Sequence, residues 1–377
     1  MKKSLLALAV LGAFAGVASA QSSVTLFGVI DVNGRYVDNG GGKQYQLSQD
    51  GMASSRIGFR GTEDLGGGLA ASFWLEGGIN PDTGTIGVTG INGGANNAAQ
   101  LFQRRSTASL SGGWGEVRLG RDYTPTFWNA TIFDPFGTNG VGSSGNLYLV
   151  VPGVPTGGGY GTLVRANNTV GYFLPSGIAG GLYGQVMMAA GEGVYGNKYW
   201  GGRLGYAAGP FNVAASYGTT QANASVNGRL YNFGGSWDFG FMALSGYYGR
   251  LNLSNANQNN WFIGATAPIG LWNIKASYGY VDRGGSLATK DGVIKVDGQK
   301  ADQFAIGADY NLSKRTALYA TYSYLSNNGN NNNGSAFTVA PLMNAPDVKG
   351  PNGVPLGGGA RAGATSSGFE FGIKHSF

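Results

Sequence analysis

Hydrophobic and polar residues alternate along most of the chain from residue 23 onward. In the first such stretch, Val24 and Leu26 lie on one face of an extended strand, and Thr25 and Asp31 lie on the other. A period of two is typical of a half-buried β-strand. Read in this way, the sequence predicts sixteen strands. They are expected at residues 23–36, 52–63, 69–79, 101–111, 115–122, 164–174, 179–190, 199–208, 211–219, 229–238, 240–253, 260–267, 271–283, 301–311, 315–326 and 367–377.

The connections between these strands alternate in length. The short ones are residues 64–68, 112–114, 175–178, 209–210, 268–270 and 311–314, and the long ones are 37–51, 80–100, 123–163, 220–228, 284–300 and 327–366. Short turns at one end, long loops at the other and an even strand number are typical of an outer-membrane barrel. A soluble sandwich has no reason to sort its loops in this way. The predicted fold is therefore an all-β, sixteen-stranded antiparallel transmembrane β-barrel, formed by a single domain over residues 21–377.

The third long connection, residues 123–163, interrupts the alternation for about forty residues. A compact domain rarely keeps an irregular loop of this length unless the loop is functional. Its aromatic and prolyl residues predict a stiff, self-packing loop: Tyr123, Pro125, Phe127, Trp128, Phe133, Pro135, Phe136, Pro152 and Pro155. Asp134 is the only acidic residue between Asp122 and Glu192. We expect this loop to fold into the barrel and to narrow a water-filled pore.

Residues 1–20 have the pattern of a secretory signal peptide. Lys2 and Lys3 precede an apolar stretch over residues 5–17, which is too short to span a bilayer as a helix. Ala18, Ser19 and Ala20 form an A-x-A cleavage site, so Gln21 is expected to start the mature chain. No later apolar run reaches the length of a transmembrane helix.

The composition excludes several classes of function. The chain has no cysteine, which removes thiol catalysis and thiolate metal sites, and its single histidine, His375, argues against a zinc site or a Ser-His-Asp triad. We therefore expect no enzyme activity, metal or cofactor. The formal net charge is +6, and without Lys2 and Lys3 it becomes +4 because 23 basic residues then face 19 acidic ones. No basic run is present, so a nucleic-acid partner is not expected.

Arg56 and Arg60 share one face of a predicted strand, opposite Ile57 and Phe59. On a lipid-exposed face near the bilayer midplane, each arginine would cost roughly 2–4 kcal/mol. Both are therefore expected to face the interior, and an interior that accepts arginines contains water. Arg165 lies opposite Val170 and Tyr172, with Asn167 and Thr169, so it is also expected to point inward.

Arg104 and Arg105 are adjacent, so a regular strand directs one of them to each side. If Arg104 points inward, a polar stripe points outward, made of Gln103, Arg105, Thr107 and Ser109. Such a stripe is too polar for lipid. We therefore expect another subunit to cover it. The direction of Arg121, where the strand meets the long loop, is left open by the pattern.

Several segments together resemble the general diffusion porins of Gram-negative bacteria, and are most similar to the β-proteobacterial branch. They are the stretches at residues 21–31 (QSSVTLFGVID), 55–69 (SRIGFRGTEDLGGGL), 119–125 (LGRDYTP), 133–137 (FDPFG) and 165–170 (RANNTV), with the terminal Phe377. The resemblance covers the whole mature chain. It implies a homotrimer of sixteen-stranded barrels in the outer membrane, with the third external loop folded into each lumen.

The resemblance also suggests where the pore is narrowest. By motif position, Arg56, Arg104 and Arg165 match a cluster of inward arginines, and Asp134 matches an acidic residue of the constriction loop. Arg60 lies one step further along the same wall. Cation-selective members carry more loop carboxylates than this chain does. At least three guanidinium groups therefore oppose one carboxylate in the expected pore.

The last nine residues alternate so that one face carries Phe369, Phe371, Ile373 and Phe377. This face is expected to point outward. It resembles the C-terminal signal by which the barrel assembly machinery recognises such proteins. His375 falls on the same face and has no expected function.

Together these features predict passive diffusion of small hydrophilic solutes and inorganic anions, with a preference for anions, through a barrel surrounded by outer-membrane lipid. A substrate-specific channel of the same fold is the alternative, in which Tyr123, Phe127 and Trp128 would belong to an aromatic track along the pore. Packing within the loop explains these three residues equally well. A barrel enzyme would need a histidine at the rim, whereas His375 lies at the opposite end.

Overall fold

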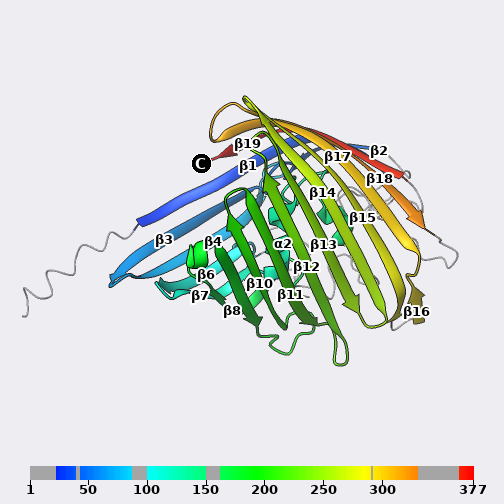
Figure 1. Cartoon of the computed structure of the whole chain (residues 1–377). Helices are drawn as coiled ribbons and strands as arrows, with labels where there is room; N and C mark the ends of the chain where they lie inside the picture. The colour runs from blue at the N-terminus through cyan, green and yellow to red at the C-terminus, as the bar shows by residue number, and fades with distance from the viewer. Residues whose placement is uncertain (1–22, 40–42, 87–99, 150–161, 290–291, 330–364) are drawn as a thin grey trace, which may run out of the picture.

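The computed structural model describes residues 23–39, 43–86, 100–149, 162–289, 292–329 and 365–377. The predicted signal peptide at residues 1–20 lies outside the described residues. So do residues 150–161 of the long loop and most of the connection 327–366. The described chain forms one large curved sheet of long tilted strands (Figure 1).

Sixteen strands of the described residues form a closed ring. They are β1 (Ser23–Asp38), β3 (Arg56–Gly66), β4 (Leu69–Asn80), β6 (Arg105–Gly112), β7 (Gly115–Tyr123), β8 (Arg165–Phe173), β9 (Leu182–Ala189), β10 (Tyr199–Ala208), β11 (Phe211–Gln221), β12 (Asn227–Asp238), β13 (Ala243–Leu253), β14 (Ala256–Ile269), β15 (Trp272–Thr289), β17 (Gln299–Asn311), β18 (Thr316–Gly329) and β19 (Thr365–Ser376). Each pairs antiparallel with the next, and β19 pairs with β1 to close the ring. The predicted sixteen-stranded antiparallel barrel is confirmed.

Three short strands extend the barrel at the end that carries the long connections. β2 (Lys43–Gln49) pairs with β1, β5 (Thr85–Ile86) with β4, and β16 (Gly292–Lys295) with β15. The sequence analysis left all three inside long loops. Each pairs with the extended end of a barrel strand, so these three short strands form hairpins and are not additional strands of the barrel.

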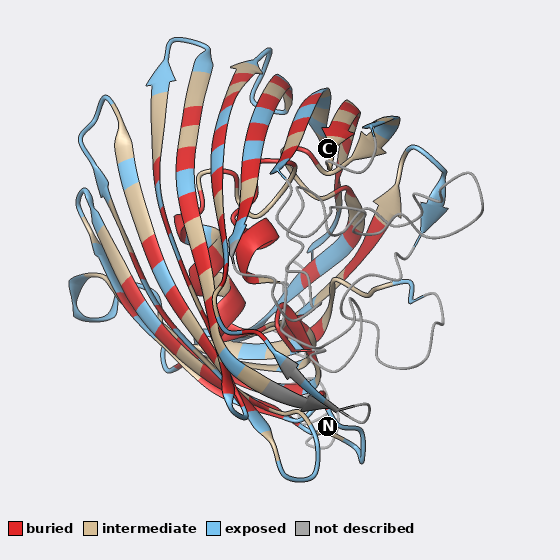
Figure 2. Ribbon diagram, turned by 90° about the vertical axis from the view of Figure 1, so that its right-hand side faces the viewer, coloured by how far each residue is buried: buried red, intermediate tan, exposed pale blue. Residues whose placement is uncertain are grey.

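Side chains alternate between the interior and the outer surface, as the period of two requires. In β1, Asp31, Asn33 and Arg35 are buried inside the barrel, whereas Val24 and Leu26 are exposed on the outside. Figure 2 shows the same alternation as buried and exposed bands along many strands. The polar residues thus line the interior, and the apolar ones cover the outer surface.

The seam between β1 and β19 holds two loops in place. The buried Arg35 and Glu370 form an ion pair of 2.8 Å across it. Glu370 Oε1 also accepts a hydrogen bond of 3.0 Å from the backbone N–H of Val141, in the long loop. Nearby, Asp31 accepts hydrogen bonds of 2.8 Å from the N–H groups of Met52 and Ala53, just before β3. Carboxylates of the barrel wall therefore anchor two separate loops.

The long loop contains two helices, α2 (Pro125–Phe133) and α3 (Gly145–Tyr148). Proline at the first position of α2 is favourable because the N–H that it lacks would have no partner within the helix. The helix ends at Asp134, whose backbone is extended because Pro135 follows. A separate 3₁₀ turn, η1 (Ile178–Gly180), connects β8 and β9.

The described part of the loop lies against the inner face of the barrel. Asn129 Nδ2 donates to the Ala214 carbonyl at 3.1 Å and to Asn232 Oδ1 at 2.8 Å. Further along, Asn146 Nδ2 donates to Gln303 Oε1 at 3.1 Å. These partners belong to β11, β12 and β17, and Figure 2 shows the buried helices inside the curve of the sheet. The loop is therefore held on one side of the interior.

Candidate functional site

Two arginines meet at the carboxylate of Glu76 on the inner wall of the barrel. Arg104 Nε lies 2.6 Å from Glu76 Oε1, and Arg56 Nη1 lies 3.8 Å from the same oxygen. Trp74 Nε1 donates to Glu76 Oε2 at 3.1 Å. Glu76 is buried, whereas Arg56 is partly exposed. This carboxylate therefore holds two guanidinium groups beside each other at the inner surface.

Tyr123 extends this cluster to the first residues of the long loop. Its hydroxyl accepts hydrogen bonds from Arg104 Nη2 at 3.0 Å and from Arg165 Nη2 at 2.5 Å. The Arg165 guanidinium carbon lies 4.2 Å from the centre of the Tyr123 ring, a cation–π arrangement. The structure thus brings together Arg56, Arg104 and Arg165, as expected from the sequence.

Aromatic rings support the other arginines of this wall. The Arg60 guanidinium lies 5.3 Å from the Phe27 ring centre and 5.2 Å from that of Trp74. Arg105 lies over Trp74 at 4.5 Å from the ring centre, with Nε 3.8 Å from Asp122. Arg60 therefore lies further along the wall than the cluster at Glu76, as the sequence placed it.

Arg118 continues the same wall on β7. It pairs with Glu116 at 2.9 Å and Asp122 at 2.6 Å, and lies 4.0 Å from the centre of the Phe173 ring. Six guanidinium groups of the described residues lie on this wall, and three carboxylates lie within 4 Å of one or more of them. The guanidinium groups are those of Arg56, Arg60, Arg104, Arg105, Arg118 and Arg165, and the carboxylates are those of Glu76, Glu116 and Asp122. The wall therefore carries an excess of positive charge.

The expected outward stripe of Gln103, Arg105, Thr107 and Ser109 is wrong. β6 begins at Arg105, and its register places Arg105 opposite Glu76 and Thr107 opposite Trp74, so these residues face inward. Arg104 precedes the strand, and its side chain also reaches Glu76. The alternation does not extend back through Arg104, because the residues before β6 are not in a strand. The stripe therefore gives no reason to expect a covering subunit.

The Asp134 carboxylate is bonded within the long loop itself. Its carboxylate accepts hydrogen bonds from the N–H groups of Phe136 at 2.9 Å and Thr138 at 3.1 Å, and from the N–H and Oγ of Ser144 at 2.9 and 2.6 Å. Burial raises its pKa above the ordinary aspartate value, and the hydrogen bond from Ser144 lowers it. Among the described ion pairs, none includes Asp134. The residue ties the loop to itself.

The loop aromatics pack as the sequence analysis expected. Tyr123 stacks on Phe127 with ring centres 5.2 Å apart, and Trp128 meets Tyr123 edge-on at 5.1 Å. Phe127, Phe133 and Phe136 are buried. These packed rings form a rigid apolar base where the loop lies against the inner face of the barrel.

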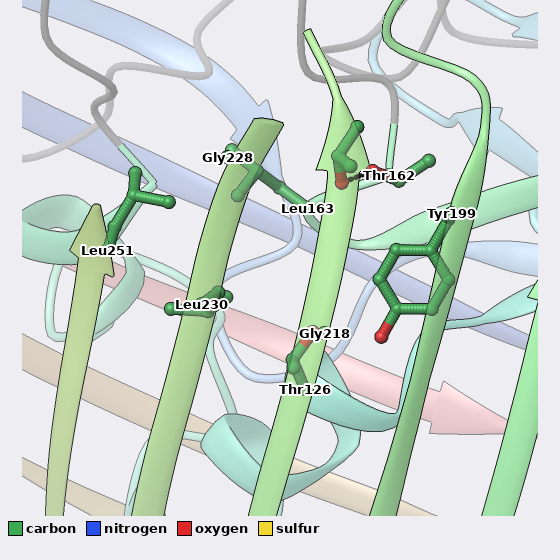
Figure 3. A pocket seen from close by; sticks show the side chains of 9 residues that line it. Thr126, Thr162, Leu163, Tyr199, Gly218, Gly228, Leu230 and Leu251 are labelled. Carbon is green, nitrogen blue, oxygen red and sulfur yellow. Dashed lines mark hydrogen bonds between the residues drawn. The ribbon is translucent and has the colours of Figure 1, made fainter. Parts of the chain in front are cut away.

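A small pocket lies between the loop and the wall, away from the arginines (Figure 3). Its lining includes Thr126, Leu163, Tyr199 and Leu251. No charged side chain lines it, so it belongs to the packing of the loop and has no features of a site for ions.

Arg121 makes its hydrogen bonds outside the cluster at Glu76. Its Nε donates to the Gln103 carbonyl at 2.5 Å, and its Nη1 donates to Asn167. A register shift between Gly120 and Asp122 interrupts the alternation at this point. Asn167, which the sequence placed on the face of Arg165, is thereby engaged with Arg121. A local irregularity of this kind leaves no pattern in the sequence.

The C-terminal strand presents its apolar face outward. Phe369, Phe371 and Ile373 are exposed on the outer surface, as is the terminal Phe377, while Glu370 between them is buried inside. The outward direction matches the alternation of the sequence. Their role as an assembly signal stays a prediction.

Sequence reasoning missed Glu76, Arg118 and Asp50. In the predicted strand 69–79, alternation puts Trp74 and Glu76 on the face opposite Phe73 and Leu75, so Glu76 could have been found as an inward carboxylate. Asp50 lies between β2 and β3 and accepts a hydrogen bond of 2.6 Å from the N–H of Ser55. Burial raises the pKa of Asp50 to about 6 despite the nearby positive charge of Arg104. No sequence signal marked this loop residue.

No group of His, Cys, Asp and Glu side chains in the described residues has the arrangement of a metal site. No helix in the described part of the chain is long and apolar enough to cross a membrane.

Comparison with known proteins places the chain among channel-forming barrels. A family model described as Gram-negative porin matches residues 7–330. The chain is 37% identical over 398 residues to outer membrane porin protein 32 of Delftia acidovorans, with 100% of each chain covered. A solved anion-selective porin from Comamonas acidovorans superposes with a TM-score of 0.75 at 34% identity, covering 95% of this chain and 100% of that one. The trimer form of OmpT from Vibrio cholerae, at 14% identity and a TM-score of 0.61, covers 94% and 99% and supports the fold alone.

Proposed function

Because the chain belongs to the Gram-negative porin family, we propose that its barrel passes small hydrophilic solutes and inorganic anions by passive diffusion, with a preference for anions. The chain is an outer-membrane protein, like its relatives. The observation that carries the anion preference is the excess of guanidinium groups on the wall around Glu76 and Tyr123. The relative from Comamonas acidovorans is itself described as anion-selective.

The physical argument rests on charge in a narrow aqueous passage. Walls of low dielectric constant focus the field of the charges that line them and raise the local concentration of counter-ions. Two unit charges 4 Å apart interact by about 4 kcal/mol at an effective dielectric constant near 20. Charged side chains that line a pore set its selectivity in the same way. The arginine wall therefore concentrates anions and repels cations.

The narrowest part of the pore is proposed to lie between this wall and the loop. Arg56, Arg104 and Arg165 provide its positive charge, and Arg60 extends that charge along the wall. Glu76 holds the guanidinium groups in place and reduces their net charge. Asp134, which the resemblance assigned to the constriction, supports it indirectly by holding the loop in shape.

Two partners are proposed besides solutes and lipid. A homotrimer is proposed on the resemblance found in the sequence, and the Vibrio cholerae protein of the same fold is described in a trimer form. The outward residues Phe369, Phe371, Ile373 and Phe377 are proposed to be recognised by the barrel assembly machinery. The family consists of channels, and we propose no catalytic activity.

The experiment that tests the proposal is the reversal potential of the purified protein in a planar bilayer under a salt gradient. We expect the sign of anion flow, and a smaller potential in the variants Arg56→Gln, Arg104→Gln and Arg165→Gln. Arg315→Gln is the matched control, because Arg315 is exposed in the short turn between β17 and β18. Cation preference, or an equal effect of the control, would contradict the assignment.

The structure favours general diffusion over a substrate-specific channel. Of the three candidate residues for an aromatic track, Phe127 is buried, and Tyr123 is engaged by Phe127, Arg104 and Arg165. Tyr123 and Trp128 each keep part of their surface exposed. Saturable transport of a sugar, measured in liposomes, would instead support the specific channel.

A further inference from the structure

We propose that four glycines on the inner face of the barrel set the width of the pore. Each lies against a residue of the constriction loop and leaves room for that residue's side chain, and we call these positions seats. Gly234 faces Phe133, Gly264 faces Pro135, Gly279 faces Leu147, and Gly307 faces Phe136. They belong to β12, β14, β15 and β17, so the seats follow the wall on which the described part of the loop lies.

The seat at Gly234 is the tightest of those against an aromatic ring. Gly234 pairs with Ala214 and Tyr247, both buried inside the barrel, so it faces the interior. A Cβ atom added at Gly234 would overlap the ring of Phe133. Phe133 is fully buried in a cluster with Tyr148 and Tyr247. The ring therefore occupies the space that any other residue at position 234 would fill.

The remaining seats repeat this arrangement with different side chains. A Cβ atom at Gly264 would overlap the Pro135 ring, again a rigid group. At Gly279 it would lie 2.8 Å from Leu147 Cδ1, and at Gly307 it would lie 3.0 Å from Phe136 Cε1. Leu147 Cδ1 is the end of a flexible side chain and can rotate away. The four seats therefore differ in how firmly they specify the position of the loop.

Space, rather than backbone conformation, explains these glycines. Glycine weakens the interior of a strand and often marks a site where another part of the chain approaches closely. None of the four has a positive φ, so an L-residue could adopt the backbone at each position. What the positions require is the absence of a side chain.

The seats and the hydrogen bonds constrain the loop in different ways. Asn129 and Asn146 attach it to β11, β12 and β17. The seats determine how closely it approaches the wall and hence how far it extends toward the arginines. An added methyl group at Gly234 would move the Phe133 ring by roughly 1 Å, because close-packed interiors rarely have room for one. The pore between loop and arginine wall would become narrower.

The inference rests on the proposed pore, and its test separates pore width from ion preference. Single-channel conductance is compared for the native protein, Gly234→Ala and Gly264→Ala, together with the reversal potential. We expect conductance to fall by roughly a fifth to a half, because conduction depends on the open radius of the pore, while the sign of the reversal potential is retained. A reversed sign with lowered conductance would count against the proposed anion preference and leave the seats supported.

Two further variants make the test specific. Gly246→Ala is the matched control, because Gly246 pairs with the exposed Ile263, and a Cβ there meets only the Phe262 carbonyl at 3.7 Å. Conductance in this control should equal that of the native protein. Combining Gly234→Ala with Phe133→Leu, which removes ring atoms from the seat, should restore conductance toward the native value. A general defect of the strand would not be rescued in this way.

Three outcomes would overturn the inference: native conductance in an assembled Gly234→Ala barrel, an equal fall in Gly246→Ala, or no rescue by Phe133→Leu. If Gly234→Ala and Gly264→Ala do not assemble, Gly279→Ala decides the question. We expect it to assemble and to lower conductance by less than a fifth, because Leu147 can rotate away. A value equal to that of Gly246→Ala would then refute the role of the seats.

Discussion

The variant Glu76→Gln tests most directly whether the charges on the arginine wall set the anion preference. The carboxylate lies 2.6 Å from Arg104 Nε and 3.8 Å from Arg56 Nη1, and the native carboxylate offsets part of their charge. Gln keeps an oxygen that can accept from Arg104 but removes one negative charge. The wall then carries one additional net positive charge. We expect the anion preference to increase.

The magnitude follows from Coulomb's law with screening. At about 8 Å from a permeating ion and an effective dielectric constant near 20, a unit charge contributes about 2 kcal/mol. Screening at a physiological ionic strength, with a Debye length of about 8 Å, reduces this to about 0.8 kcal/mol. The local anion concentration should then rise roughly threefold to fourfold. At 1 M salt, where the Debye length is about 3 Å, the increase should nearly vanish.

The assay is the reversal potential of Glu76→Gln in planar bilayers at both salt concentrations. Assembly is checked first by the heat-dependent shift of the barrel on a gel, because removing one partner of a buried pair can destabilise a protein by about 3–5 kcal/mol. An assembled variant with unchanged or reduced anion preference at low salt would refute the reasoning. An increase of equal size at 1 M salt would show that the effect is not electrostatic.

Three further predictions concern the loops and the seam. Asp134→Ala leaves the buried N–H groups of Phe136 and Ser144 without their acceptor, at a cost of about 1–3 kcal/mol for each. Urea unfolding should show the loss of stability, whereas a reversal potential altered as much as in Arg104→Gln would place Asp134 in the pore. The pKa of Asp50 is about 6, so lowering the pH from 7.5 to 5 protonates it, removes a negative charge near Arg104 and should increase the anion preference. The reversal potential of Asp50→Asn should not change over the same pH range. Equal pH responses in both proteins would exclude Asp50 as the cause. Glu370→Gln leaves the Arg35 guanidinium buried without its counter-charge and should lower the stability of the barrel by about 3–5 kcal/mol. The temperature at which the barrel shifts on a gel measures this loss of stability. A stability equal to that of Arg315→Gln would mean that the seam between β1 and β19 does not depend on the ion pair.

The directions of most pore residues could be predicted from the sequence. Arg56 and Arg60 lie on a regular part of β3, where residues alternate with apolar neighbours, and a charged side chain on the lipid side is too costly. Arg104 and Arg105 could not be assigned in this way. The expected strand 101–111 starts four residues before β6, which begins at Arg105, so the alternation was extended through residues that are not in a strand.

Carboxylates were harder to place than arginines. Asp134 and Glu76 are each one acidic residue in an uncharged stretch, and chain position favoured Asp134 because it lies in the loop. The partners of Asp134 are N–H groups of Phe136, Thr138 and Ser144, and their position depends on how the loop folds back on itself. Glu76 meets Arg104 only because β4 and β6 pair in one register.

The sequence by itself determined the barrel and the face on which most strand residues lie, because the alternation of side chains is a local property of the extended chain. Only the tertiary structure decided which wall receives the loop and which residues meet across the interior. Asn129 and Asn232 lie 103 residues apart, and other contacts that hold the loop also join distant parts of the chain. Such contacts depend on the register of distant strands and on the space left by residues such as Gly234, and neither leaves a periodic pattern in the sequence.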